Sequence, residues 1–176
     1  ERGVLLHQKN DNLCIEAEGI SGDEEFKIHA SVPFDQSELV PHTFINYAKH
    51  SNESEVINDA QTEERFCADP YVIKNQTISM MCVPLTSQGK TNGLLYLENN
   101  LIKGVFNKNR IKLLKMLSGQ IGISIDNAIL YENLEEKVIE RTKEIEKQKL
   151  EIEQQKEKSD SLLLNILPKH AAEELK

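Results

Sequence analysis

The stretch Thr77–Asn99, TISMMCVPLTSQGKTNGLLYLEN, decides the fold. Two apolar runs, Ile78–Leu85 and Leu94–Leu97, lie on either side of Gln88-Gly89-Lys90, a pattern typical of two strands joined by a hairpin turn. Because nearly every residue of both runs is apolar, each strand needs cover on both of its faces. The stretch therefore predicts the centre of a sheet with a layer packed on each side.

The segments around this hairpin predict the rest of the sheet and its cover. Residues 3–8, 12–19, 26–32 and 55–59 read as further strands, and Ser37–His50 reads as an amphipathic helix with Ser37 as its N-cap and Pro41 in its first turn. A helix from Asn107 onward carries apolar residues at helical spacing that we expect to cover one face of the sheet: Ile111, Leu114, Leu117, Ile121 and Ile125. The fold class is α+β, with a mainly antiparallel sheet flanked by helices and a long C-terminal coiled-coil helix.

Composition limits the partners. The chain has 176 residues and a net charge of -8, and it contains no apolar run of the ~18 residues that a membrane span requires. The acidic balance argues against nucleic acid as a direct partner, since phosphate contacts need clustered Lys and Arg. The odd, widely spaced Cys14, Cys67 and Cys82 favour a reduced, cytoplasmic protein. Without a starting Met or a signal segment, the chain reads as a fragment of a longer protein.

Residues 59–136 resemble the second half of a GAF domain. The resemblance rests on Asp69-Pro70-Tyr71, on CVPL (82–85), on GLLYLEN (93–99), on GVF (104–106) and on QIGISIDNAILY (120–131). It extends over roughly residues 3–131, although the helix that precedes the first strand in the family is missing. The resemblance implies a regulatory sensor domain without catalysis of its own.

GAF domains bind various ligands, and none of them can be assigned from this sequence. Of the cyclic-nucleotide signature only Asn107-Lys108 is present, and no Cys-His pair suits a bilin. The five histidines lack the spacing of a haem or zinc site. The cofactor therefore stays unknown, and no metal site is predicted.

The resemblance places a ligand pocket between the sheet and the segment RFCADPYV (65–72). Its candidate residues are Phe66, Cys67 and Tyr71, with Ser79 or Met81 from the facing strand. The alternative is that these side chains are ordinary core residues, because buried Cys and Met are common packing material.

From Asn127 to Lys158 the chain predicts a coiled coil. A seven-residue repeat places Tyr131, Val138, Ile145, Ile152, Ser159 and Ile166 at position a, and Asn127, Leu134, Arg141, Gln148, Gln155 and Leu162 at position d. β-Branched residues at position a favour a parallel homodimer, in which Glu144 and Glu151 would pair with Lys149 and Lys156 of the second copy. A lone solvated helix, stabilised by Glu–Lys pairs three residues apart, is the alternative.

The last segment, 159–176, resembles the linker directly upstream of class III nucleotide cyclase domains. Its Leu-rich stretch ends in Asn-Ile-Leu-Pro, and Pro168 disfavours helix at the residue before it and suits the first turn of a new helix. We expect a hinge at Pro168; a coiled-coil end with a helix breaker is the alternative.

Together these features predict a sensor (1–126), a signalling helix (127–158) and a linker (159–176) that regulate an adenylyl or guanylyl cyclase and hence cyclic AMP or cyclic GMP synthesis. The sensor could instead control a histidine kinase or a serine phosphatase, although residues 135–158 contain no His to accept a phosphoryl group. A cysteine-based methionine sulfoxide reductase is a third, enzymatic alternative, which requires thiols that can form disulfides.

Overall fold

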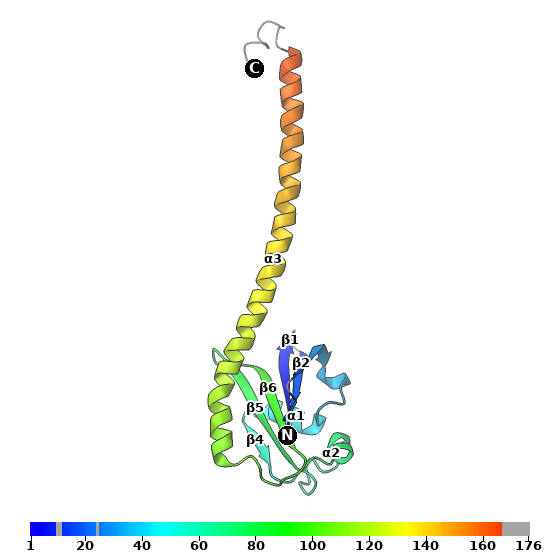
Figure 1. Ribbon diagram of the computed structural model, residues 1–176, viewed down its shortest axis with the longest axis vertical. Helices are drawn as coiled ribbons and strands as arrows, with labels where there is room; N and C mark the ends of the chain where they lie inside the picture. The colour runs from blue at the N-terminus through cyan, green and yellow to red at the C-terminus, as the bar shows by residue number, and fades with distance from the viewer. Residues whose placement is uncertain (10–11, 24, 167–176) are drawn as a thin grey trace. The chain divides into compact units, whose positions relative to one another are not determined.

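The computed structural model describes residues 1–9, 12–23 and 25–166, which fold as two compact units. Unit 1 is Glu1–Asn127, and unit 2 begins at Ala128. Unit 1 contains six strands and the start of a helix that continues through unit 2 (Figure 1). The strands are β1 (Arg2–Lys9), β2 (Asn12–Ile20), β3 (Lys27–Pro33), β4 (Glu55–Ile57), β5 (Ser79–Ser87) and β6 (Lys90–Asn99). The helices are the 3-10 turn η1 (Phe34–Gln36), α1 (His42–Ser51), α2 (Pro70–Asn75) and α3 (Lys108–Ile166).

The strands form one antiparallel sheet in the order β3-β2-β1-β6-β5-β4. At its centre, β5 and β6 are joined by a two-residue turn in which Gln88 (φ 51°) and Gly89 (φ 78°) both have positive φ. Positive φ at both residues is the conformation that matches the twist of a tight hairpin, and Gly adopts it without strain. The predicted hairpin is confirmed.

The sheet is covered on both faces, as its apolar central strands require. On one face Met80 and Cys82 pack with Phe44 of α1 and Val72 of α2, while on the other Met81 and Val83 pack near the first turns of α3. Successive residues of β5 point to opposite faces, so one apolar strand contributes to both clusters. Figure 1 shows the start of α3 along β5 and β6, and α2 on the far side of the sheet.

The first helix begins later than the sequence predicts. We expected Ser37 to be its N-cap, but α1 starts at His42 and its N-cap position is Pro41. Ser37 instead accepts a hydrogen bond from the backbone N–H of Leu39, 3.1 Å away, in a local turn. A proline has no N–H to donate and no side-chain oxygen to cap with, so α1 takes its cap from a residue distant in sequence, as described below.

The start of α3 confirms part of the predicted cover. Asn107 caps the helix by accepting hydrogen bonds from the N–H groups of Asn109 (3.1 Å) and Arg110 (3.0 Å). Ile111 and Leu114 pack on the Met81 cluster as predicted, but Leu117 is 44% exposed. Six residues after Ile111, Leu117 has turned about 240° around the helix and points away from the sheet.

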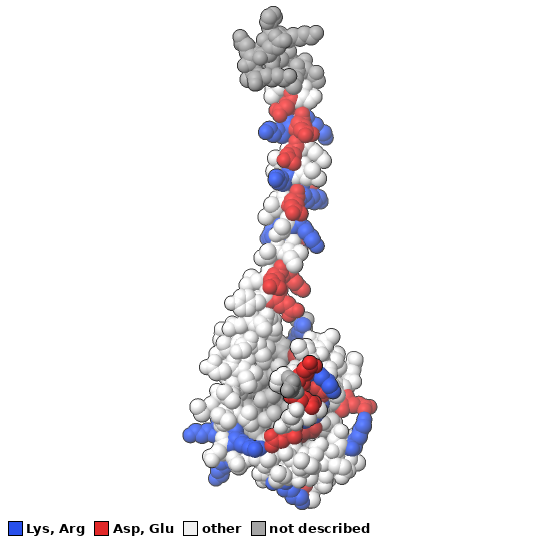
Figure 2. Space-filling view, viewed as in Figure 1, with Lys and Arg blue, Asp and Glu red and all other residues white. Residues whose placement is uncertain are grey.

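Unit 2 continues α3 as a single helix, which confirms the long C-terminal helix. The apolar residues at heptad positions a and d, which we call the seam, are exposed: Leu134 by 47%, Val138 by 62%, Ile145 by 63%, Ile152 by 65% and Leu162 by 61%. Acidic and basic side chains alternate along this helix (Figure 2). Pro168 lies outside the described residues.

Candidate ligand site

The buried carboxylate of Asp69 holds the first turns of two helices. Its Oδ1 accepts a hydrogen bond from the N–H of Tyr71 (2.8 Å), which caps α2, and Pro70 follows at the first helical position. Its Oδ2 accepts hydrogen bonds from the N–H (2.9 Å) and the hydroxyl of Thr43 in the first turn of α1. One side chain, 4% exposed, therefore fixes α1 and α2 relative to each other.

A cavity of about 420 Å³ opens beside this double cap. We call it the helix-end cavity; it is lined by Ser37, Glu38, Val40, His42, Thr43, Asp69, Pro70, Tyr71 and Lys74. The ion pair between Lys74 Nζ and Glu38 Oε2 (2.8 Å) lies at its exposed side. Its wall includes the His42 ring, which lies 4.6 Å from the Phe34 ring and bonds the carbonyl of Ser37 through Nε2 (2.6 Å).

A buried polar network begins behind Tyr71. The Tyr71 hydroxyl donates to Glu98 Oε1 (2.8 Å) and accepts a hydrogen bond from Arg2 Nη1 (2.7 Å). Arg2 reaches Glu18 Oε2 with its other nitrogen at 2.7 Å, and Tyr96 donates to Glu98 Oε2 at 2.8 Å. The network therefore connects β1, β2 and β6 to α2.

The network sets the charge of its members. Burial alone would raise the pKa of the Glu18 carboxyl, but the hydrogen bonds and positive charges of Arg2 and Lys27 together outweigh burial and lower the pKa. Burial, with the negative charge of Glu98 nearby, raises the pKa of Tyr71 far above its usual range, so its hydroxyl stays a donor. Tyr71 thus connects the cavity to a network of charged side chains that are already hydrogen-bonded to one another.

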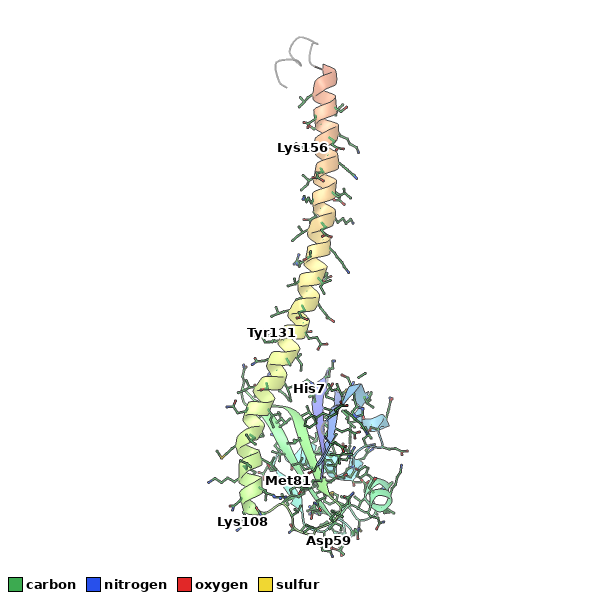
Figure 3. The ribbon with its side chains drawn as sticks, viewed as in Figure 1. His7, Asp59, Met81, Lys108, Tyr131 and Lys156 are labelled. Carbon is green, nitrogen blue, oxygen red and sulfur yellow. The ribbon has the colours of Figure 1, made fainter. Side chains whose placement is uncertain are left out.

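The structure separates the residues predicted to line a pocket. Tyr71 lines the helix-end cavity. Phe66 is buried against Phe44, with ring centroids 5.2 Å apart, and Cys67 is partly exposed. Ser79 is buried and donates to two backbone carbonyls, while Met81 lies in the body of the domain in the cluster next to α3 (Figure 3). A ligand role for these five residues stays a prediction.

None of the three cysteines lines the helix-end cavity. All three cysteines are free, and burial raises the pKa of the Cys82 thiol, which disfavours the reactive thiolate. Within residues 1–9, 12–23 and 25–166, no group of three or more His, Cys, Asp or Glu side chains is arranged to hold a metal ion.

Sequence reasoning missed the residues that organise the site. The Asp69-Pro70 pair is itself an N-cap signal that could have identified the capping carboxylate. Arg2 and Glu98 are direct cross-strand neighbours, but β1 and β6 are the first and last strands along the chain, so their pairing can be known only from the strand order. No local pattern contains that information.

Comparison with known proteins identifies the fold. The family model described as GAF domain matches residues 3–125. The chain belongs to the GAF domain family. It is 37% identical over 89 residues to the hybrid signal transduction histidine kinase G of Dictyostelium discoideum. That alignment covers 51% of this chain and 3% of the relative, so the chain spans a small part of the relative's length.

Two solved GAF domains show the same architecture. One comes from a two-component sensor histidine kinase of Bacillus halodurans, with a TM-score of 0.54, 20% identity and coverage of 74% of this chain and 84% of that one. The other comes from the Acinetobacter phosphoenolpyruvate-protein phosphotransferase, with a TM-score of 0.52 and 17% identity; the match covers 75% of this chain and 74% of that one. At these identities the likeness establishes the fold alone.

The family defines the coarse role of the chain. It is a GAF sensor domain of the kind found in signalling proteins, and such domains are typically regulatory and non-catalytic. Among the helices that the structure describes, none is long and apolar enough to cross a membrane.

Proposed function

We propose that this GAF domain is the sensor of a cytoplasmic, dimeric signalling protein and relays ligand binding through a parallel coiled coil to a class III nucleotide cyclase. The observation that supports a coiled-coil relay is that the apolar seam residues of unit 2 are exposed. Val138, Ile145 and Ile152 are each more than 60% exposed on a charged helix that no other described segment of the chain covers. Exposed apolar residues at heptad spacing are stabilised when a second helix covers them.

The input in this proposal is the helix-end cavity. A ligand there would contact Tyr71 and the side chains around Asp69, the residue that fixes both α1 and α2. A shift of Tyr71 would disturb the hydrogen bonds to Glu98, on β6 under the start of α3, and to Arg2, on the neighbouring strand β1. Small movements at the cavity could then bias the dimer between two arrangements.

The output in this proposal rests on the resemblance of residues 159–176 to a cyclase linker. It is tested by expressing the protein with the residues that follow Lys176 and measuring cyclic AMP from ATP and cyclic GMP from GTP. The fragment 1–176 alone is the matched control and should form neither product. Pro168→Ala should change basal activity or regulation, because each added helical residue turns the output domain by ~100°. Absence of cyclic nucleotide from the longer protein would contradict the cyclase assignment.

A histidine kinase output is the second candidate, because the 37%-identical relative is named a hybrid signal transduction histidine kinase. In that case the longer protein should incorporate phosphate from ATP in an acid-labile, phosphohistidine form and make no cyclic nucleotide. Residues 135–158 contain no His, so the acceptor would follow Lys158. The two assays on one preparation distinguish the candidates.

A further inference from the structure

The last turn of α3 in unit 1 is tied to the β5–β6 hairpin by a charged hydrogen bond. The Asn92 side-chain amide, on β6, donates through Nδ2 to both carboxylate oxygens of Asp126, at 2.8 Å to Oδ1 and 2.9 Å to Oδ2. Asp126 lies one residue before Asn127, where unit 1 ends. Figure 1 shows α3 passing beside the turn end of this hairpin. Because a hydrogen bond to a charged acceptor is stronger than one between neutral groups, this contact can fix the helix at the end of the unit.

A β-bulge directs Asn92 toward the helix. Leu85 of β5 pairs with Gly93, and the next residue, Thr86, pairs with Thr91, so Asn92 is an extra residue between the two pairs. A bulge bends its strand and re-aims the side chain of the extra residue, at the cost of regular pairing. The hairpin therefore carries a local irregularity at the residue that binds the helix.

Small side chains bring α3 close to the hairpin just before this contact. One face of the helix carries residues spaced four apart: Leu114, Ser118, Gly122 and Asp126. Along this face the side chains shrink from leucine to glycine, and both Ser118 and Gly122 are buried. A Cβ on Gly122 would lie 2.8 Å from the backbone oxygen of Thr86, so glycine is needed for this approach. The helix is thus closest to the hairpin one turn before Asp126.

Strand β6 also reaches the helix-end cavity. Glu98, six residues after Asn92 on this strand, accepts a hydrogen bond from the hydroxyl of Tyr71, which lines the cavity. Six residues of strand span about 20 Å. Because β6 is paired with β1 on one side and β5 on the other, it is a rigid connection between the two contacts.

We propose that the Asn92–Asp126 contact is a latch: it holds the last turn of α3 in unit 1 on the hairpin, and its loosening is the step by which β6 passes a signal from the helix-end cavity to the helix. A hydrogen bond suits this role because its strength falls steeply with distance and angle, so a small displacement of β6 weakens it. The latch itself rests on the contacts described above, whereas its role in signalling rests on the proposed function.

Hydrogen exchange of the amides of residues 119–126 in the 1–176 chain tests the latch. A helix released from the sheet is only marginally stable in water, so its amides exchange faster. Asn92→Asp places two carboxylates against each other and should speed this exchange by roughly tenfold or more. The swap Asn92→Asp with Asp126→Asn restores one donor and one acceptor, and should return the rate to within about threefold of the wild type. Gln88→Asp adds the same charge at the exposed turn of the hairpin; it is the matched control and should have no effect.

Tyr71→Phe tests the signalling role in the same chain. It removes the hydroxyl that binds Glu98 and should speed the same exchange about threefold, but not when Asn92→Asp has already opened the latch. Tyr47→Phe, at a residue of α1 that is 40% exposed, is the matched control and should leave the rate unchanged. Exchange of the α1 amides shows whether a variant lowers the stability of the whole unit.

Three results would overturn the inference. If Asn92→Asp leaves the exchange unchanged, or if the swap exchanges as fast as Asn92→Asp alone, the contact is not a latch. If Tyr71→Phe acts equally with and without the latch, the signalling role is wrong. Asn92→Ala removes the donor without adding repulsion, and should speed the exchange about threefold even if Asn92→Asp impairs folding. These measurements need no ligand, second copy or output domain, so failure of the coiled-coil or cyclase assignment would leave their results unchanged.

Discussion

The two units of this chain reach their structures by different means. In unit 1 Phe44, Tyr96 and Met80 have no exposed surface, and the buried carboxylate of Glu18 is paired with the partly buried Arg2. In the described part of unit 2 the apolar residues of the seam are 47% exposed or more, and a cross-turn ion pair such as Arg141–Glu144 (3.2 Å) is exposed as well.

This difference shows where each unit obtains its stability. Unit 1 buries enough apolar surface within one chain to specify its own fold. Isolated helices in water are only marginally stable, and exposed i,i+3 ion pairs add a few tenths of a kcal/mol each. The helix of unit 2 should therefore depend on a partner, whereas unit 1 should not.

The largest effect is expected from Phe44→Ala in unit 1. Phe44 contacts Phe66 and Tyr96 edge to face with no exposure, so the change should lower the free energy of unfolding by about 3–5 kcal/mol. Ile73→Ala on the same side of the sheet, where Ile73 is 57% exposed, is the control and should cost far less. Chemical denaturation monitored on unit 1 measures both, and equal losses would contradict the assigned core.

Asp69→Ala should have the next largest effect. It removes the cap of two helices and leaves the N–H groups of Thr43 and Tyr71 without a partner, at a cost of about 2–3 kcal/mol. Asp69→Asn keeps one carbonyl oxygen and should cost less. Equal stability of all three proteins in denaturant titrations would show that the double cap contributes nothing.

The Arg2–Glu18 pair predicts a pH dependence. Because the pKa of the Glu18 carboxyl in the folded state lies below its ordinary value of about 4.5, the stabilising effect of the pair is complete above that ordinary value and is lost as pH falls through the folded pKa. Thermal melts should show a loss on the order of 1–2 kcal/mol, typical of a charge-assisted hydrogen bond, as pH falls below about 4.5. Arg2→Gln should be less stable at neutral pH and should show a shallower decline. Parallel declines in both proteins would contradict this pairing.

The sequence predicted the sheet and the long helix because their signals are local. Alternation, apolar runs and the Gln88-Gly89 turn are readable over a few residues. The start of α1 was misplaced because its cap comes from Asp69, 26 residues after Thr43. The inward orientation expected of Leu117 was wrong because helical spacing identifies apolar positions without identifying which partner each one faces.

The smallest effect is expected in unit 2. Replacing Lys149 and Lys156 with Glu puts like charges opposite Glu144 and Glu151 of the second copy and should weaken the dimer by ~1 kcal/mol at low salt and by less at high salt. Sedimentation at two ionic strengths measures it. A salt-independent or absent change would argue against the parallel register.

The parallel relay is tested most directly by cysteine cross-linking in the middle of unit 2. Ile152→Cys places a thiol at position a, where the two copies of a parallel coil face each other, and Glu153→Cys places one on the outer face. Under mild oxidation Ile152→Cys should form a disulfide-linked dimer and Glu153→Cys should not. Equal cross-linking at both positions, or a chain that stays monomeric at micromolar concentration, would contradict the account.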